Sequence, residues 1–167
     1  MRSTQDRLRE LLQLPAVTQI GIVVPDLEEA IAFYQEKFLI GPFERIPDFQ
    51  KLGYQETYYK GEPGNFNSTF AFFRLGMTEI EIIQPLYGRS IYRDFLERGR
   101  QGLHHLGFDV YDDFDERLAA YAGIGIGVLM SGRSPSRAFA YLDTEKIGGV
   151  VFELLDRGGP RKLLNET

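Results

Sequence analysis

The first half of the chain opens with Gln19-Ile20-Gly21-Ile22-Val23-Val24-Pro25-Asp26, and the second half opens with the similar run His105-Leu106-Gly107-Phe108-Asp109-Val110-Tyr111-Asp112. Near its end, each half has an apolar segment that carries a carboxylate, Glu81 in the first half and Glu153 in the second. A duplicated unit that packs against its own copy buries a shared core. The repeat therefore predicts that Gln19, Glu81, His105 and Glu153 come together.

Strand alternation gives these residues a common orientation. In each opening strand a glycine follows the polar residue by two positions, Gly21 after Gln19 and Gly107 after His105, on the same face. A missing side chain leaves room for a bulky group against the strand. Taken singly, a Gln, Glu or His is more often a surface or hydrogen-bonded residue than a metal ligand. Only Glu153 lies in a run so apolar that a carboxylate without a function is not expected there. The polar residues occupy the same position in the strand alternation of both halves, which favours a metal site.

His104 and His105 are the two histidines of the chain. Neighbouring residues on a strand point to opposite faces, so we expect at most one of them at the site. His105 is in register with Gln19, and we expect His104 to be a packing or hydrogen-bonding residue.

The hydrophobic pattern predicts an α+β fold of two βαβββ modules that pair into a cupped mixed sheet, with an extra N-terminal helix. Within each module a strand precedes a helix, which Asp26 caps in the first module. Ser90 is the expected cap of a linking helix. The expected segments are an N-terminal helix in residues 1–16, a first module in 17–88, a linking helix in 89–103, a second module in 104–157 and a tail in 158–167.

Composition limits the function. The 167 residues carry a net charge of −5 without a basic cluster, which argues against a nucleic-acid partner. Zero cysteines exclude disulfides, thiolate zinc sites and cysteine nucleophiles. The charged start resembles no signal peptide, and no later stretch is apolar enough to span a bilayer. We expect a cytoplasmic protein without a membrane partner.

The chain resembles the vicinal oxygen chelate (glyoxalase/bleomycin resistance) superfamily from about Thr18 to Leu155. The likeness is most specific in QIGIVVPDLEEAIAFYQEKFLIGPF, in TEIEIIQPL followed by GLHHLGFDV, and in YLDTEKIGGVVFELL. It is strongest to the methylmalonyl-CoA epimerases. The resemblance implies a divalent metal ion in the cupped sheet, and we also expect a homodimer. The implied metal ligands are Gln19, Glu81, His105 and Glu153.

Two features depart from the epimerase pattern. Epimerases usually have His at the position of Gln19 and Gln at that of Glu81, and the combination found here resembles animal-type glyoxalase I. The stretch from Pro42 to Leu75 is also longer, so no epimerase base aligns onto it.

One imidazole nitrogen and three oxygens suit Zn, Co, Ni or Mn. Four protein ligands on a six-coordinate ion leave two positions for two oxygens of a substrate, whose carbonyl the ion would polarise as a Lewis acid. We expect Glu153 to act as the base, with Glu81 second.

The sequence thus favours a metal-dependent isomerase, most like methylmalonyl-CoA epimerase, acting on an acyl-CoA. The runner-up is a glyoxalase I-like lyase acting on a thiol adduct of a 2-oxoaldehyde. An extradiol dioxygenase would need a second histidine, and a non-enzymatic, ligand-sequestering protein of the bleomycin-resistance type would lack the four ligands. Most of the aromatics from Phe43 to Phe73 are expected in the core and the dimer interface, and some could line an apolar pocket for an acyl or aromatic group. Arg133 and Arg137, in a polar turn, either bind a substrate anion or are solvated.

Overall fold

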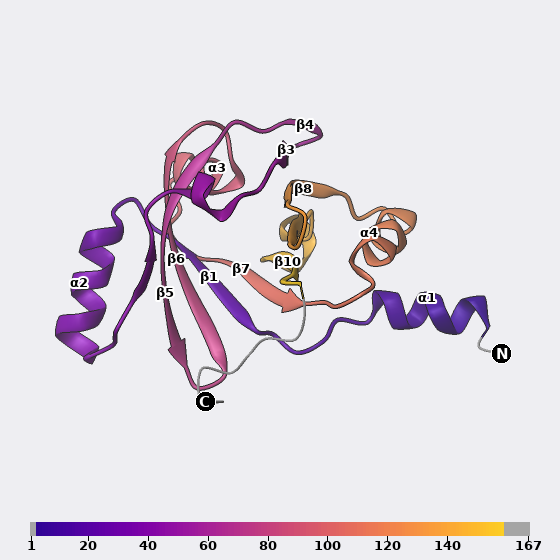
Figure 1. Cartoon of the computed structure of the whole chain (residues 1–167), viewed down its shortest axis with the longest axis horizontal. Helices are drawn as coiled ribbons and strands as arrows, with labels where there is room; N and C mark the ends of the chain where they lie inside the picture. The colour runs from indigo at the N-terminus through magenta and orange to yellow at the C-terminus, as the bar shows by residue number, and fades with distance from the viewer. Residues whose placement is uncertain (1–2, 159–167) are drawn as a thin grey trace.

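Ten strands form one curved mixed sheet in the computed structural model, which describes residues 3–158 (Figure 1). The order across the sheet is β2-β5-β6-β1-β7-β10-β9-β8-β3-β4. The strands are β1 (Gln19–Val23), β2 (Glu44–Ile46), β3 (Glu56–Tyr59), β4 (Glu62–Pro63), β5 (Asn67–Leu75), β6 (Thr78–Tyr87), β7 (Gly102–Asp109), β8 (Val128–Arg133), β9 (Ala138–Leu142) and β10 (Val151–Asp156).

The predicted duplication is confirmed in the arrangement of the strands. The two opening strands, β1 and β7, pair antiparallel at the centre of the sheet. Each also pairs in parallel with the last strand of its own half, β1 with β6 and β7 with β10. The predicted fold class, two βαβββ modules with an additional N-terminal helix, is therefore correct.

Two of the helices, α2 and α3, begin at the caps that the sequence predicts. The side chain of Asp26 accepts a hydrogen bond from Glu29 N, and that of Ser90 accepts one from Arg93 N. None of the helices among the described residues is long and apolar enough to cross a membrane. The α-helices are α1 (Thr4–Leu12), α2 (Leu27–Phe38), α3 (Ile91–Glu97), α4 (Phe114–Gly123) and α5 (Glu145–Gly148), and a 3-10 turn, η1, covers Phe49–Leu52.

A short hairpin of the first half extends the sheet of the second half. Strand β3 pairs antiparallel with β8, and β4 pairs with β3, so the segment between β2 and β5 crosses from one edge of the sheet to the other. No local pattern in the sequence indicates that the partner of β3 lies in the other module. Because of this crossing, η1 and the following loop lie over the concave face.

Apolar side chains form three clusters. Helix α2 packs on the outer side of the first half, where Leu27 and Ile31 meet Ile82. Helices α4 and α1 cover the outer side of the second half (Figure 1). The third cluster, which includes residues of η1 and α3, fills the concave side of the sheet. This aromatic interior surrounds the polar residues that form the candidate site.

Candidate metal centre

The central strand pair positions two of the four predicted ligands reciprocally. Gln19 stands opposite Gly107, and His105 stands opposite Gly21. A Cβ added to Gly21 would lie 1.9 Å from Cε1 of His105, and one added to Gly107 would lie 2.9 Å from Cβ of Gln19. Each glycine therefore makes room for the polar side chain of the other module, which is the bulky group that the sequence pattern left unidentified.

The other two predicted ligands approach from the neighbouring strands. Nε2 of His105 lies 3.3 Å from Oε2 of Glu81 and 3.3 Å from Oε2 of Glu153. One ligand atom from each of Glu81, His105 and Glu153 falls within 4.8 Å of the others, a spacing that could hold a metal ion. The structure thus brings one carboxylate from each module to the same imidazole.

All four predicted ligands are buried and have an atom without a partner. Gln19 Oε1, Glu81 Oε2, His105 Nε2 and Glu153 Oε2 are enclosed atoms that form no hydrogen bond with any described residue. Native proteins rarely bury polar atoms without a hydrogen-bond partner, because the loss of hydration on burial is then not compensated by a hydrogen bond. A divalent cation would satisfy these atoms together, so the donor set fits the metal that the sequence predicts.

The amide of Gln19 is held by a network that the sequence analysis missed. Its Nε2 donates to Oε1 of Glu79 over 2.9 Å, which leaves Oε1 of Gln19 facing the site. Arg157 donates to the same Glu79 oxygen over 3.1 Å and to Oδ1 of Asp109 over 2.8 Å. Burial alone would lower the pKa of Arg157, but Glu79 and Asp109 outweigh it and raise that pKa. Glu79 lies two residues before Glu81, so strand alternation alone could have indicated it.

Electrostatics keep a proton between the two carboxylates when no cation is bound. Burial would lower the pKa of His105, yet the nearby carboxylates of Glu153 and Glu81, each 3.3 Å from its Nε2, raise it to about 9. The pKa of the Glu81 carboxyl is raised, chiefly by burial. In a metal-free site, His105 is therefore a protonated imidazolium at neutral pH, and its positive charge takes the place of the metal ion's charge beside the two carboxylates.

The expectation that His104 and His105 point to opposite faces is wrong in detail. The register shifts so that Gly21 pairs with His105 and Ile22 with Leu103, which leaves His104 as an extra residue on β7. The two imidazoles meet, with Nδ1 of His104 3.0 Å from Nδ1 of His105.

His104 remains a packing and hydrogen-bonding residue, as predicted. Its ring meets Tyr92 and Phe95 of α3 edge to face. Burial first, and then the charge of His105, lower the pKa of His104 well below its usual value, so its imidazole is neutral. A neutral His104 can serve as the hydrogen-bond partner of Nδ1 of His105 while Nε2 of His105 faces the carboxylates.

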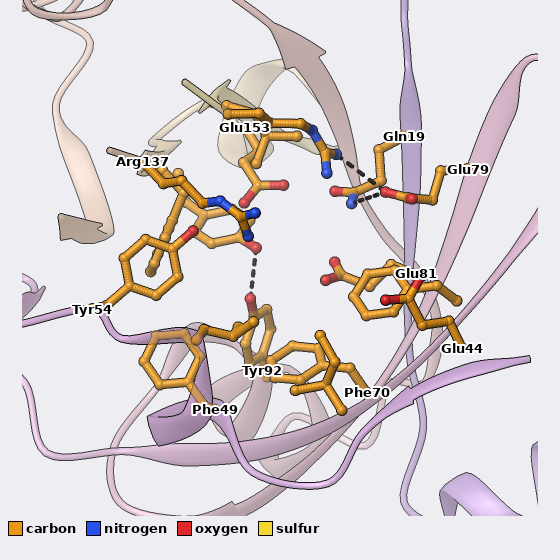
Figure 2. Close-up of a pocket in the computed structure, with 17 residues that line it drawn as sticks. Gln19, Glu44, Phe49, Tyr54, Phe70, Glu79, Glu81, Tyr92, Arg137 and Glu153 are labelled. Atoms are coloured by element: carbon orange, nitrogen blue, oxygen red, sulfur yellow. Dashed lines mark hydrogen bonds and ion pairs between the residues drawn. The ribbon is translucent and has the colours of Figure 1, made fainter. Parts of the chain in front are cut away.

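Three of the four candidate ligands, Gln19, Glu81 and Glu153, line a cavity of about 270 Å³, and Figure 2 shows their side chains at its wall. The hydroxyls of Tyr92 and Tyr141 lie 2.5 Å apart there. Burial raises the pKa of both phenols well above 10, so they stay protonated. Two hydroxyls sharing one hydrogen bond leave one O–H free to donate, and the described residues offer it no second acceptor. The apolar wall consists of Ile46, Phe49, Leu52, Phe70, Phe72, Phe139 and Leu155.

The aromatic segment from Phe43 to Phe73 divides between core and cavity. Phe43 and Phe73 pack with α2, whereas Phe49 and Phe70 belong to the concave cluster and also line the cavity. The prediction that most of these rings fill the core is correct, and some of the core rings are also the walls of the site.

Comparison with known proteins places the chain among proteins of this architecture. The family model described as Glyoxalase/Bleomycin resistance protein/Dioxygenase superfamily matches residues 18–141. The uncharacterized protein YqjC of Bacillus subtilis is 30% identical over 145 residues, which cover 84% of this chain and 91% of that protein.

Solved structures show the same fold at lower identity. A variant of Streptomyces coelicolor methylmalonyl-CoA epimerase in complex with 2-nitronate-propionyl-CoA has a TM-score of 0.64 at 19% identity, over 90% of this chain and 100% of that chain. A hypothetical protein from Bacillus halodurans has a TM-score of 0.61 at 18% identity, over 89% and 98%.

Proposed function

The chain belongs to the Glyoxalase/Bleomycin resistance protein/Dioxygenase superfamily, and we propose that within it this protein is a metal-dependent isomerase that acts at the carbon next to a carbonyl, like a methylmalonyl-CoA epimerase. The observation that carries the proposal is the set of four enclosed ligand atoms that form no hydrogen bond with the described residues, three of them on residues that line a cavity. The proposed ligands are Gln19, Glu81, His105 and Glu153.

A divalent ion in this position would supply Lewis-acid stabilisation of the negative charge that develops when a carbon next to a carbonyl loses its proton. The protein's own groups carry the proton. We assign proton removal to Glu153, with Glu81 as the second candidate, because both carboxylates border the cavity. Gln19 and His105 are ligands only.

The two tyrosines supply a hydrogen-bond donor in the proposed reaction. Tyr141 pairs with Glu153 across β9 and β10, so its hydroxyl lies on the same wall as the proposed base. The free O–H of the Tyr92–Tyr141 pair can donate to a substrate oxygen as charge develops on it.

Hydrogen exchange tests the proposal. An epimerase returns a proton to the carbon that lost it, so incubation with methylmalonyl-CoA in D2O should place deuterium at the carbon between the two carbonyls faster than buffer alone. EDTA should abolish this acceleration. Absence of exchange with metal-loaded protein would contradict an epimerase.

The types of the ligands favour one second candidate, a glyoxalase I-like lyase. Gln19 and Glu81 are the residues of a glyoxalase-like ligand set, not of an epimerase-like one. A glyoxalase moves the proton to the neighbouring carbon. If methylmalonyl-CoA does not exchange while the hemithioacetal of methylglyoxal and glutathione is converted to a thioester, the lyase replaces the epimerase.

A further inference from the structure

The turn between β8 and β9 holds two arginines whose surroundings differ. Ser134 N donates to Arg137 O over 2.8 Å, and Arg137 N donates to Ser134 Oγ over 3.1 Å, which closes the turn. Arg133, before the turn, forms an ion pair with Asp115 and lies over the ring of Phe114 on the outer side. Its charge is therefore already matched by α4.

Arg137 instead lines the cavity. Arg137 directly precedes β9 and alternates with Phe139 and Tyr141 of that strand, which are also at the cavity wall. Figure 2 shows the guanidinium of Arg137 extending inward, toward the space between Tyr54 and Glu153. Tyr141 stands opposite Glu153, and Arg137 lies four residue steps before Tyr141, about 13 Å along an extended backbone. The long side chain of Arg137 points back toward the site, so its guanidinium lies closer to the site than its backbone does.

The charge of Arg137 has no counter-ion among the described residues. Of the two arginines at the cavity, Arg157 is bound to Glu79 and Asp109, whereas Arg137 forms no ion pair within residues 3–158. A divalent ion would balance the charges of Glu81 and Glu153, so no unmatched carboxylate of the metal site remains for Arg137. A guanidinium in this position matches the planar oxygens of a carboxylate or the oxygens of a phosphate.

We propose that Arg137 binds an anionic group of the substrate, a carboxylate or a phosphate, at the cavity rim while two other substrate oxygens lie at the candidate metal centre. This inference rests on the proposed function and narrows it to carbonyl compounds that carry a further oxyanion. The cavity volume of about 270 Å³ favours a compact reacting part.

Binding of matched chelators tests the site without turnover. Three probes share a 2-oxo acid head and differ at the far end: 2-oxoglutarate ends in a carboxylate, 2-oxo-4-phosphonobutanoate in a phosphonate, and 5-methyl-2-oxohexanoate in an uncharged isopropyl group. Calorimetry with metal-loaded protein should show that at least one anionic probe binds about tenfold more tightly than the uncharged one. The better of the two anionic probes identifies the group.

The variants separate a specific contact from general charge. Arg137→Met should remove the preference for the anionic end, Arg137→Lys should keep part of it, and Arg133→Met should leave it unchanged. A preference that survives in Arg137→Met, equal binding of all probes by the parent, or binding of none would overturn the inference. The deuterium exchange judges the proposed function separately, because it compares the parent protein with and without EDTA and uses no variant of Arg137.

Discussion

At the scale of single residues, His104 and His105 have different roles although they are neighbours. Only His105 directs a ring nitrogen at Glu81 and Glu153, whereas His104 contacts the far side of that ring. Purified without chelator, the parent should hold about one divalent ion per chain.

Substitution of the two histidines should separate these roles. His105→Ala should abolish metal binding, and His104→Ala should keep the stoichiometry with about tenfold weaker affinity, because it loses only the group that orients the ligand. Elemental analysis and metal titration measure both quantities. Equal loss in the two variants, or a parent without metal, would contradict the assignment.

The proposed roles of Glu153 as ligand and base can be separated by an isosteric change. An amide still offers an oxygen to a cation but cannot take up a proton. Glu153→Gln should therefore lower kcat at least about a hundredfold, with a much smaller effect on substrate binding. Glu81→Gln is the matched comparison in the other module. Unchanged turnover in Glu153→Gln would transfer the role of base to Glu81.

At the scale of elements, the reciprocal glycines of β1 and β7 make the site possible. Gly21→Ala would place a methyl group 1.9 Å from the His105 ring, and β-sheet backbone on both sides prevents a simple shift. We expect the free energy of unfolding to fall by about 3 kcal/mol and metal binding to be lost.

A second glycine provides the control. Gly127 has nothing within 4 Å of an added Cβ, so Gly127→Ala should change stability by less than about 0.5 kcal/mol and keep the metal. Urea denaturation and metal titration of the two variants give the comparison. A Gly21→Ala protein with parental stability would mean that β1 and β7 are not packed as described.

The elements that the sequence predicts well are those with local signals. The stripe of apolar residues and the Asp26 cap locate α2, and Ser90 locates the start of α3. The extra residue at His104 and the pairing of β3 with β8 have no comparable signal, because both depend on which strand lies alongside. An uninterrupted alternation of side chains along β7 therefore predicts the wrong face of the sheet for the His104 side chain.

At the scale of the whole molecule, the two modules share one proton when no metal is bound. His105 belongs to the second module and Glu81 to the first, and their contact contributes to a folded pKa of His105 of about 9, above its ordinary value of 6.5. The folded protein thus binds more protons than the unfolded chain between these values. The resulting stabilisation is full below about pH 6.5 and is lost as the pH rises through about 9. The raised pKa of Glu81 acts in the same direction.

Metal-free protein should accordingly lose on the order of 2 kcal/mol of unfolding free energy between pH 6.5 and 9.5. Metal-loaded protein should lose less, since the cation takes the place of the proton. Chemical denaturation with EDTA or with excess metal measures both profiles. His105→Gln should flatten the metal-free profile, and a parental slope in that variant would assign the titration to another group.

The sequence by itself determined the duplication, the α+β class and the nature of the four candidate ligands. The reason is that the repeat and the alternation of polar and apolar residues along strands can be recognised from the order of the residues alone. Only the tertiary structure decided that Gly21 accommodates His105 and that Glu79 holds Gln19. It likewise separated Arg137 at the cavity from Arg133 on the outer surface. Such contacts join residues far apart in the chain, and their energies depend on the geometry of two strands or modules together.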